Sequence, residues 1–394
     1  MYKQIPSGYK QTKIGVIPED WKVEKIKKIF TKISTPVTVS MDEHYQQIGI
    51  RSHGKGIFYK EKITGKDLGN KSVFWIKADC LILNIVFAWE QAVAKTTDKE
   101  VGMIASHRFP MHKPNPEQAN INYFLYFFKS KRGKLSLELA SPGGAGRNKT
   151  LGQSEFAQLD MPLPPLKEQE KIAEILSTWD EAIAKQQQLI EQKQVFKKSM
   201  MQLIFNQKIR LRDDNGNAYP DWTEKRLGDI SDIKTGKKDL INKVDNGCYP
   251  FYVRSENIER INSYSYDGEA ILIPGDGKIG EIYHYINGKF DYHQRVYKIS
   301  NSAENLKFIY YYLKTFFYKH AISFTVKATV DSLRLPIIQS FTISLPYLEE
   351  QTKIANFLIS IDDEITKKAE VLEQLKQQKK SLMQKLLTGQ VRVV

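Results

Sequence analysis

Apolar residues recur at helical spacing along two long stretches that contain neither proline nor glycine, from Lys167 to about Asn206 and from Glu349 to about Thr388. Both stretches are rich in Glu, Gln, Lys, Leu and Ala, which favour helix. The apolar positions follow the spacing of a heptad seam: Ile172, Leu176, Trp179, Ile183, Ile190, Met200 and Ile204 in the first stretch, and Ile354, Leu358, Ile361, Ile365, Leu372, Leu375, Leu382 and Leu386 in the second. This pattern predicts two helices of about 40 residues, each roughly 60 Å long.

A helix of this length with one apolar stripe is not stable alone in water, so we expect the two helices to pack on each other as a coiled coil. They run antiparallel if the globular segments of the chain sit at opposite ends of the pair. The alternative is that each helix only caps its own domain. The shared heptad phase and length of the two stretches favour the paired arrangement.

Shorter patterns predict the elements around these helices. The segments "MPLPPL" and "SLPYL" each end a strand-like run just before a long helix, where proline is tolerated. The aromatic runs "INYFLYFFKSKRGK" and "ENLKFIYYYLKTFFYKH" have the periodicity of amphipathic helices. We therefore expect most of their Tyr and Phe side chains in a core rather than on a ligand.

The two helical stretches belong to an internal repeat. The segment from Leu163 to Arg212 aligns without gaps to the segment from Leu345 to Val394, and 20 of the 50 pairs are identical. A second pair of matching segments, "PEDW" with Trp21 and "YPDW" with Trp222, precedes the two helices. Between these anchors the sequences hardly resemble each other, except that "IGIRSHGKG" matches "FYVRSENIE" and pairs Arg51 with Arg254. The chain is thus a duplication whose helices stayed alike while its globular segments diverged.

These observations predict an α+β fold with a pseudo-twofold repeat, in which two globular domains are separated by two long antiparallel helices. The expected organisation is an N-terminal extension (1–19), a first globular domain (20–165), a central helix (166–207), a linker and second globular domain (208–348), and a C-terminal helix (349–394). The turn-rich segment "RDDNGNAYPDW" serves as the linker.

Charge narrows the class of partner. The 394 residues carry a formal net charge of +14, and residues 1–165 account for +10 of this net charge. An excess of Lys and Arg favours an anionic partner such as DNA, bound through counterion release. The longest apolar run, "CLILNIVFAW", is too short for a membrane span. The start of the chain lacks the apolar segment of a signal peptide, and Cys80 and Cys248 offer no disulfide framework, so we expect a cytoplasmic protein with both thiols reduced in the core.

Candidate DNA contacts come from loops, because Arg, Gln and Asn side chains match the edges of guanine and adenine. The sequence offers Arg51, Ser52, Arg108, Arg147, Lys149, Arg254, Ser255, Asn257, Lys278, Gln294 and Arg295. The segment "DYHQRVYKI" with His293 corresponds to "ASHRFPMHK" with His107. Each of these residues has the alternative of being a surface or structural polar group.

The motifs of several enzyme classes are missing. The segment "GDGKIG" matches the glycine spacing of a dinucleotide site, but "EIYHYINGKF" after it reads as strand and turn, whereas that site needs a helix. The segment "GGAGRNKT" fails the spacing of a phosphate-binding loop, and the seven histidines include no HExxH zinc motif. The Asp/Asn-Pro-Pro-aromatic motif of amino-methyltransferases is also missing. The sequence therefore predicts a binding protein with no catalytic residue and no metal site of its own.

The duplicated helix openings "LPPLKEQEKIAEIL…D" and "LPYLEEQTKIANFL…D", the "IPEDW" and "YPDW" segments and the two divergent globular segments resemble the specificity (S) subunits of type I restriction-modification enzymes. The resemblance covers essentially the whole chain. It implies that the globular segments are target recognition domains, each reading one half of a bipartite site in double-stranded DNA. It also implies that the helices set the spacing of the halves and dock two methyltransferase subunits.

The same resemblance implies the cofactors and partners. This chain would bind no cofactor; the methyltransferase (M) partner would use S-adenosylmethionine, and the restriction (R) partner would use ATP and Mg²⁺. Two equivalent docking sites explain the repeat, and the candidate docking residues are Glu168, Gln169, Lys171, Glu350, Gln351 and Lys353. The alternatives are a coiled-coil scaffold that does not read DNA sequence, and a self-sufficient nuclease or methyltransferase.

Overall fold

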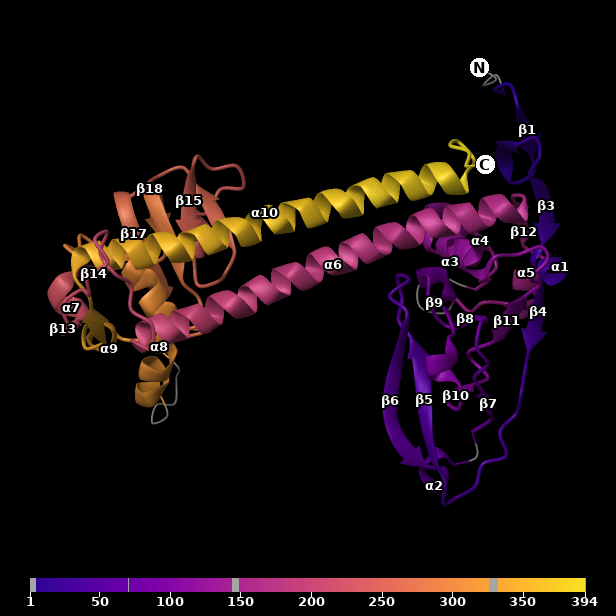
Figure 1. Cartoon of the computed structure of the whole chain (residues 1–394), viewed down its shortest axis with the longest axis horizontal. Helices are drawn as coiled ribbons and strands as arrows, with labels where there is room; N and C mark the ends of the chain where they lie inside the picture. The colour runs from indigo at the N-terminus through magenta and orange to yellow at the C-terminus, as the bar shows by residue number, and fades with distance from the viewer. Residues whose placement is uncertain (1–4, 70, 144–148, 326–331, 394) are drawn as a thin grey trace. The chain divides into compact units, whose positions relative to one another are not determined.

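Two helices of 40 residues each, α6 (Leu166–Phe205) and α10 (Leu348–Leu387), run through both compact parts of the molecule (Figure 1). The computed structural model describes residues 5–69, 71–143, 149–325 and 332–393. Contacts divide the chain into unit 1 (Met1–Gln186 with Val371–Val394) and unit 2 (Gln187–Glu370). Each unit therefore holds one globular part together with half of each long helix, and the predicted helices are confirmed.

The long helices pack antiparallel within each unit. In unit 1, Ile172 and Leu176 near the start of α6 share a core with Leu386 and Leu387 at the end of α10. In unit 2, Ile204 near the end of α6 shares a core with Leu358 near the start of α10. The buried stripes match the predicted seam, so the expectation that the helices pair is confirmed.

Unit 1 contains two four-stranded sheets, in the orders β4-β11-β8-β9 and β6-β5-β10-β7, and two antiparallel pairs, β1-β2 and β3-β12. Its strands are β1 (Tyr9–Thr12), β2 (Gly15–Pro18), β3 (Lys22–Lys25), β4 (Phe30–Ile33), β5 (His44–Ile50), β6 (Ile57–Thr64), β7 (Val73–Trp75), β8 (Leu81–Leu83), β9 (Val93–Lys95), β10 (Ile104–Ser106), β11 (Met111–Pro114) and β12 (Asp160–Leu163). Its shorter helices are α1 (Ile26–Ile29), α2 (Gly65–Leu68), η1 (Ala88–Glu90), η2 (Asp98–Glu100), α3 (Ile121–Lys129), α4 (Lys131–Leu139) and α5 (Gln153–Ala157).

Unit 2 contains one six-stranded sheet, in the order β14-β19-β17-β18-β15-β16, and the antiparallel pair β13-β20. Its strands are β13 (Thr223–Arg226), β14 (Asp232–Thr235), β15 (Tyr249–Tyr252), β16 (Ile258–Ile261), β17 (Tyr266–Pro274), β18 (His284–Tyr292), β19 (Val296–Ser300) and β20 (Thr342–Leu345). Its shorter helices are α7 (Leu227–Ile230), η4 (Leu240–Asn242), α8 (Leu306–Thr325) and α9 (Leu335–Gln339).

The two units share a topology that their sequences conceal. The antiparallel order β4-β11-β8-β9 in unit 1 corresponds to β14-β19-β17-β18 in unit 2. In unit 2 the parallel pair of β15 with β18 extends this sheet, whereas in unit 1 the parallel pair of β5 with β10 lies in the second sheet. The strand before each long helix pairs with the strand that follows the Trp anchor, β12 with β3 and β20 with β13. The repeat therefore includes the globular parts.

The aromatic helices lie in the cores, as predicted. Asn120 caps α3 by accepting hydrogen bonds from the backbone N–H groups of Asn122 and Tyr123, which places Phe124 and Phe127 in the core. In unit 2, Phe308 and Phe317 of α8 are fully buried. These rings pack against the long helices and stabilise the frame.

Residues near the two ends of the chain contact each other in unit 1. The Tyr9 hydroxyl donates a hydrogen bond of 2.7 Å to the carbonyl of Gly389, and the Arg392 guanidinium donates one of 2.6 Å to Asp20. Gly389 follows the end of α10 with φ of 71°, and a Cβ there would lie 2.5 Å from the Pro18 ring. Glycine suits this position both for its left-handed backbone and for lack of space.

The two cysteines of the chain differ in their exposure to solvent. Cys80 is buried, but Cys248 is exposed. The expectation that both thiols lie in the core is therefore wrong for Cys248, because this residue sits at the solvent-facing end of the turn that leads into β15. Among the described residues, no helix is long and apolar enough to cross a membrane.

Candidate nucleic-acid interface and partner surface

A buried carboxylate joins the start of each long helix to the rest of its unit. In unit 1, Glu168 accepts a hydrogen bond of 2.9 Å from the Trp21 indole and two more, of 2.8 and 2.9 Å, from the Arg392 guanidinium. The hydrogen bond to Glu168 is the main reason that the pKa of Arg392 is raised. Arg392 also bonds Asp20 and thereby lowers the pKa of that carboxyl group.

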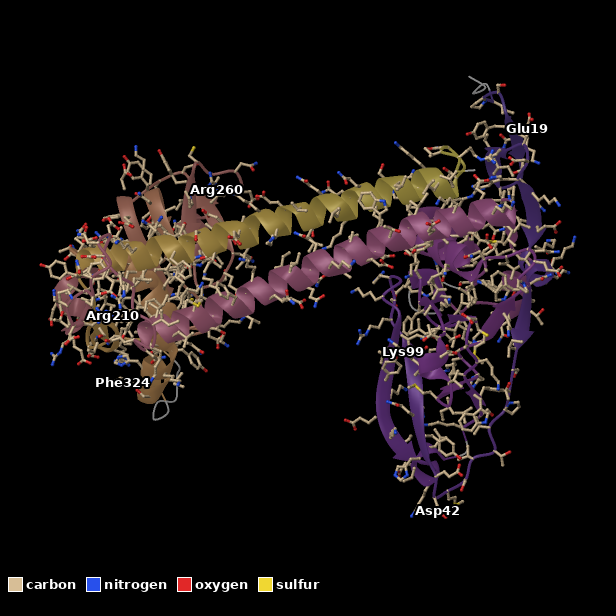
Figure 2. All side chains as sticks on the ribbon, in the orientation of Figure 1. Glu19, Asp42, Lys99, Arg210, Arg260 and Phe324 are labelled. Atoms are coloured by element: carbon tan, nitrogen blue, oxygen red, sulfur yellow. The ribbon has the colours of Figure 1, made fainter. Side chains whose placement is uncertain are left out.

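Unit 2 repeats this joint with different segments of the chain. Glu350 accepts hydrogen bonds of 3.0 and 2.8 Å from Arg210, and one of 3.3 Å from the Trp222 indole. Arg210 lies just beyond the end of α6 (Figure 2), and its hydrogen bond to Glu350 raises its pKa. Arg210 and Arg392 are an aligned pair of the repeat, so the sequence match reports a shared joint.

The glutamine after each buried glutamate ties the strand–helix junction to a second helix. The Gln169 amide accepts a hydrogen bond of 2.9 Å from the backbone N–H of Asn120 and donates one to the Pro164 carbonyl. Gln351 makes the same pair of bonds with Asn305 and Pro346. Both amides are fully buried, and these bonds satisfy backbone groups that the prolines and helix ends leave open.

The predicted docking residues therefore divide into two groups. Glu168, Gln169, Glu350 and Gln351 are buried and bonded within their own units, which leaves these side chains no exposed surface for a partner. We assign these four side chains to the joints, because hydrogen-bond partners within each unit already satisfy their polar atoms. Partner docking at this part of the helices stays a prediction. Lys171 is exposed and pairs with Glu174 at 2.9 Å, whereas Lys353 bonds Asp214 at 2.6 Å.

A second repeated contact locks the long helices together further along. Asp180 of α6 accepts a hydrogen bond of 2.8 Å from the Tyr126 hydroxyl and pairs with Lys379 of α10. In unit 2, Asp362 of α10 accepts a hydrogen bond of 2.7 Å from Tyr311 and pairs with Lys197 of α6. Burial lowers the pKa of Lys197, although its bond to Asp362 opposes the shift.

Three turns of unit 2 bring most of its predicted DNA contacts together. They are the turn after β15 with Arg254, Ser255 and Asn257, the turn between β17 and β18 with Lys278, and the turn between β18 and β19 with Gln294 and Arg295. Asp276 accepts hydrogen bonds from Arg254 at 3.0 Å and from Arg295 at 3.3 Å. The sequence segment "GDGKIG" forms a turn with Gly277 at φ of 81°, and strand β18 rather than a helix follows it. The strand that the sequence predicts after this glycine turn is therefore confirmed.

A second carboxylate organises the next part of this loop cluster. Asp239 accepts a hydrogen bond of 2.7 Å from the Gln294 amide and lies 3.3 Å from the buried His293 ring. The backbone N–H of Leu240 is the main reason that the pKa of Asp239 is lowered. Lys278 lies 3.8 Å from Glu256 on the neighbouring turn. The cluster therefore offers positioned amide and guanidinium groups at the surface.

The corresponding turns of unit 1 are held together differently. Ser52 donates a hydrogen bond of 2.9 Å to Glu90, and Lys149 lies 5.7 Å from the centre of the Trp89 ring, so both meet η1. Arg51 lies over the Phe58 ring at 5.5 Å. The exposed Arg108 joins this region through its carbonyl, which accepts from the Ile85 N–H at 3.0 Å. Arg147 lies outside the described residues.

The turns with Ser52 and with Arg254 follow corresponding strands of the two units, β5 and β15. Comparison with known proteins identifies the family of the chain. A family model described as the type I restriction modification DNA specificity domain matches residues 18–192 and 219–377, one match for each half of the repeat. The chain belongs to the type I restriction-modification specificity subunits. It is a non-catalytic subunit of such an enzyme, and the family match disfavours the self-sufficient enzyme and the scaffold that reads no DNA.

Individual relatives agree with this assignment. The chain is 27% identical over 439 residues to the putative type I restriction enzyme MjaX specificity subunit of Methanocaldococcus jannaschii, covering 100% of this chain and 98% of that one. It is 33% identical over 174 residues to the EcoDI specificity subunit of Escherichia coli, which covers 44% of this chain and 38% of the relative. These names describe the relatives.

Solved structures share the fold. A chain of a type I restriction-modification system, from work on complex assembly and conformational transition, superposes with a TM-score of 0.62 at 17% identity and covers 95% of this specificity subunit and 99% of that chain. The S subunit from M. genitalium gives a TM-score of 0.59 at 15% identity, covering 93% of this chain and 96% of that one. At such low identity the likeness concerns the fold alone.

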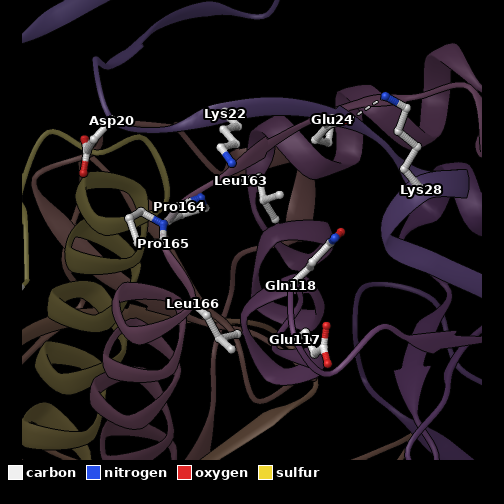
Figure 3. A pocket seen from close by; sticks show the side chains of 10 residues that line it. All are labelled: Asp20, Lys22, Glu24, Lys28, Glu117, Gln118, Leu163, Pro164, Pro165 and Leu166. Carbon is white, nitrogen blue, oxygen red and sulfur yellow. Dashed lines mark ion pairs between the residues drawn. The ribbon is translucent and has the colours of Figure 1, made fainter.

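The specificity subunit also has an open pocket at the start of α6 in unit 1. Its volume is about 620 Å³, and Figure 3 shows the residues that line it: Asp20, Lys22, Glu24, Lys28, Glu117, Gln118, Leu163, Pro164, Pro165 and Leu166. Lys28 pairs with Glu24 at 3.2 Å across part of this lining. The mixed charges and two prolines suit a contact with protein better than an apolar ligand. Among the described residues, no group of three or more His, Cys, Asp or Glu side chains could hold a metal ion.

Sequence reasoning missed the acidic members of the loop clusters, Asp276, Asp239 and Glu90. A search for DNA contacts favours Lys and Arg, and acids within basic loops count against such a site. The available signal was position, because Asp276 follows the strand-like run "AILIPG" within a glycine turn. Pairing of that carboxylate with Arg254 and Arg295 depends on three separate turns and is not visible in the sequence.

Proposed function

We propose that each unit of this specificity subunit reads one half of a bipartite target in double-stranded DNA. The observation that carries the proposal is the repeated joint, in which Glu168 with Arg392 and Glu350 with Arg210 fix two frames of one topology. Similar frames with unlike loops are what a protein needs to read two unlike half-sites in one manner. The loop clusters around Arg254 and Ser52 are the proposed reading surfaces.

The remaining DNA candidates keep their roles within this proposal. In unit 1 they are Arg51, Ser52, Arg108, Arg147 and Lys149, and in unit 2 they are Arg254, Ser255, Asn257, Lys278, Gln294 and Arg295. Most are exposed Arg, Lys or amide side chains on turns, the kinds that contact phosphates and base edges. Ser255 is the least available of them, because its hydroxyl already donates to the Asn257 carbonyl and its own carbonyl bonds His284.

A domain exchange tests the two-part reading. Residues 20–165 are replaced by the first globular domain of another specificity subunit, with both long helices and residues 208–348 left intact. We expect methylome sequencing of a host that expresses the chimera with its methyltransferase to show one altered half-site and one unchanged half-site. A target that changes in both halves, or a continuous site without an unread gap, contradicts the proposal.

We also propose that α6 and α10 set the distance between the half-sites. The register of the pair supports this role, since Asp180 meets Lys379 and Lys197 meets Asp362 at matching positions of the repeat. Deleting residues 187–190 and their equivalents 369–372 removes about one turn from each helix and keeps this register. The methylated target should retain both half-sequences with a changed spacer, and an unchanged spacer would count against the helices as its determinant.

The third part of the proposal is that the helices dock two methyltransferase subunits. Leu189 of α6 and its repeat equivalent Val371 of α10 are both exposed apolar residues, and α6 also exposes Val195 and Phe196. Exposed apolar side chains that group together on a surface mark protein contacts. Lys171, Lys353 and the pocket beside Pro164 and Pro165 add polar rims to the proposed surface.

Stoichiometry tests this docking. Leu189→Asp and Val371→Asp are made separately, and native mass spectrometry counts methyltransferase subunits bound to each chain. We expect one bound copy for each single variant and two for the wild type, while the exposed Gln377→Asp serves as a control that keeps both. The methyltransferase partner would bring S-adenosylmethionine and flip the target adenine, and restriction subunits would bring ATP and Mg²⁺. Two bound copies in both variants would remove Leu189 and Val371 from the surface.

A further inference from the structure

The loop cluster of unit 2 contains an acid that holds two arginines at once. Oδ2 of Asp276 accepts from Nη1 of Arg254 at 3.0 Å and from Nη1 of Arg295 at 3.3 Å. The Asp276 side chain is 16% exposed, whereas the side chains of Arg254 and Arg295 are 48% and 62% exposed. A mostly buried carboxylate thus anchors two guanidinium groups that remain largely open to solvent.

Anchoring leaves most of each guanidinium available for recognition. An arginine has five N–H donors in a rigid fork, and each of these arginines donates one hydrogen bond to Asp276. Two parallel N–H groups of a guanidinium match O6 and N7 of guanine in the major groove. A guanidinium that is already oriented loses less conformational entropy on binding, so anchoring favours a defined base contact.

The charges around the pair favour reading of bases over attraction to phosphates. Asp276 offsets the charges of Arg254 and Arg295, and Glu256 lies 3.8 Å from Lys278. Asp239 accepts a hydrogen bond from Gln294, which precedes Arg295 in the chain. Phosphate binding benefits from unpaired positive charge, which releases counterions from DNA. Acids at this position weaken the attraction to phosphates and restrict the arginines. Both effects reduce DNA affinity, so they are useful only where the orientation of the arginines matters for reading a base.

The other oxygen of Asp276 supports this interpretation. Oδ1 is buried and has no hydrogen-bond partner among the described residues. Buried side-chain oxygens without a donor are uncommon, because leaving one unpaired costs free energy. With this acceptor in reserve, either arginine can turn toward a base edge while a second N–H keeps it attached to the carboxylate.

We propose that Asp276 is a specificity-determining positioning residue, which holds Arg254 and Arg295 so that each reads a guanine in the half-site of unit 2. That half-site therefore contains two G·C pairs contacted in the major groove. The inference rests on the proposed function, in which unit 2 reads one half of the target. To that proposal the inference adds the base that is read, guanine, and the residue that positions the reading arginines, Asp276.

The test uses the assembled complex of this subunit with its methyltransferase. The complex binds a DNA library that is randomised over both halves of the target, and bound DNA is sequenced. Arg254→Ala and Arg295→Ala should each relax the preference at one guanine by about tenfold or more. Asp276→Ala should relax both guanines together, and the half-site of unit 1 should stay unchanged.

Matched variants separate positioning from loss of charge or fold. Asp267→Asn removes an equal charge from the opposite end of β17, where the side chain is exposed, and should leave every preference unchanged. Asp239→Asn should change a position other than the two guanines, since Asp239 holds Gln294. If Asp276→Ala does not fold or assemble, Arg254→Lys and Arg295→Lys decide, because lysine keeps the charge but lacks the fork.

The contradicting results are distinct. The inference is overturned if the half-site read by unit 2 contains no G·C pair whose preference changes in the Arg254 and Arg295 variants. It is also overturned by an Asp276→Ala variant that keeps full preference, or by one that weakens binding to all sequences equally, as a purely structural role would. A wild-type complex that selects no two-part motif contradicts the proposed function itself, which the Asp276 variant alone cannot do.

Discussion

Units 1 and 2 are built on one frame but differ in how that frame is finished. Both have a buried glutamate that binds an arginine and a tryptophan, but Trp21 is fully buried at 2.9 Å from Glu168, whereas Trp222 is only partly buried at 3.3 Å from Glu350. The reading loops differ more, since Asp276 holds two arginines in unit 2 and Glu90 holds Ser52 in unit 1. The comparison teaches that duplication preserved the joints and released the loops.

The tryptophans should give the largest measurable contrast. Trp21→Ala removes a fully buried ring and the Glu168 contact, and should destabilise unit 1 by about 3–5 kcal/mol. Trp222→Ala should cost about half as much, because that ring is only partly buried, although it contacts Phe308 and Arg210. Denaturant unfolding of the two variants measures the difference. Equal losses would mean that the two joints are equivalent despite their burial.

Acid should affect unit 1 through His112. Burial lowers the pKa of His112 to about 4, so the folded unit keeps this ring neutral while the unfolded chain protonates it below about 6.5. Stability from this group is complete above pH 6.5 and falls as the pH drops toward 4, by about 2 kcal/mol at pH 5. Unfolding of wild type and His112→Phe across this range checks it. The variant should lose less stability than the wild type between pH 7 and pH 5.

The helix ends provide a matched pair of substitutions. Gly389 after α10 and its repeat equivalent Gln207 after α6 both have left-handed backbones, with φ of 71° and 57°. Gln207→Gly should stabilise unit 2 by about 1 kcal/mol, because glycine adopts this conformation without strain. Gly389→Ala should destabilise unit 1 by more than that, since its Cβ meets Pro18. Thermal unfolding of the two variants measures the direction of each stability change. A loss of stability in Gln207→Gly would show that contacts of the Gln207 side chain stabilise unit 2.

The ion pairs between the long helices should have the smallest effect. Asp180→Asn breaks the pair with Lys379, and Asp362→Asn breaks the pair with Lys197. All four side chains retain solvent contact, so each loss should be about 0.5–1 kcal/mol and should shrink in high salt. A double-mutant cycle with Lys379→Met or Lys197→Met isolates each pair. A coupling that persists in high salt would indicate more burial than the structure shows.

Sequence reasoning predicted the helices, their antiparallel seam and the repeat, because identical joints constrain identical residues. It named Glu168 and Gln169 as docking candidates, because the repeated helix opening fits two equivalent partner sites. Only the fold shows that Trp21 and Arg392, far apart in sequence, enclose that carboxylate. The shared topology of the globular parts was also invisible, because strand order constrains hydrophobicity and length but few residue identities.

The candidate site was predicted in part for a related reason. Arg254 and Arg295 were recognisable as residues that suit DNA, and the structure brings them to one carboxylate. Asp276, the acid that joins them, was not recognisable as part of the site, because an aspartate in a turn usually only shapes the turn. Long-range pairing among three turns has no periodic signature, so such sites have to be found from coordinates.

The contact between the chain ends has a consequence for the order in which the polypeptide is connected. Arg392 completes for unit 1 what Arg210, inside the chain, completes for unit 2, and Tyr9 fastens the same region to Gly389. Arg392 and Arg210 therefore occupy equivalent joints, and the chain runs on into a further domain after only one of them. A circular permutant opened within the turn at Asp213–Ala218, with a short linker joining the present ends, should fold to the same architecture. A tag placed at the carboxyl end, by contrast, has to leave the guanidinium of Arg392 seated.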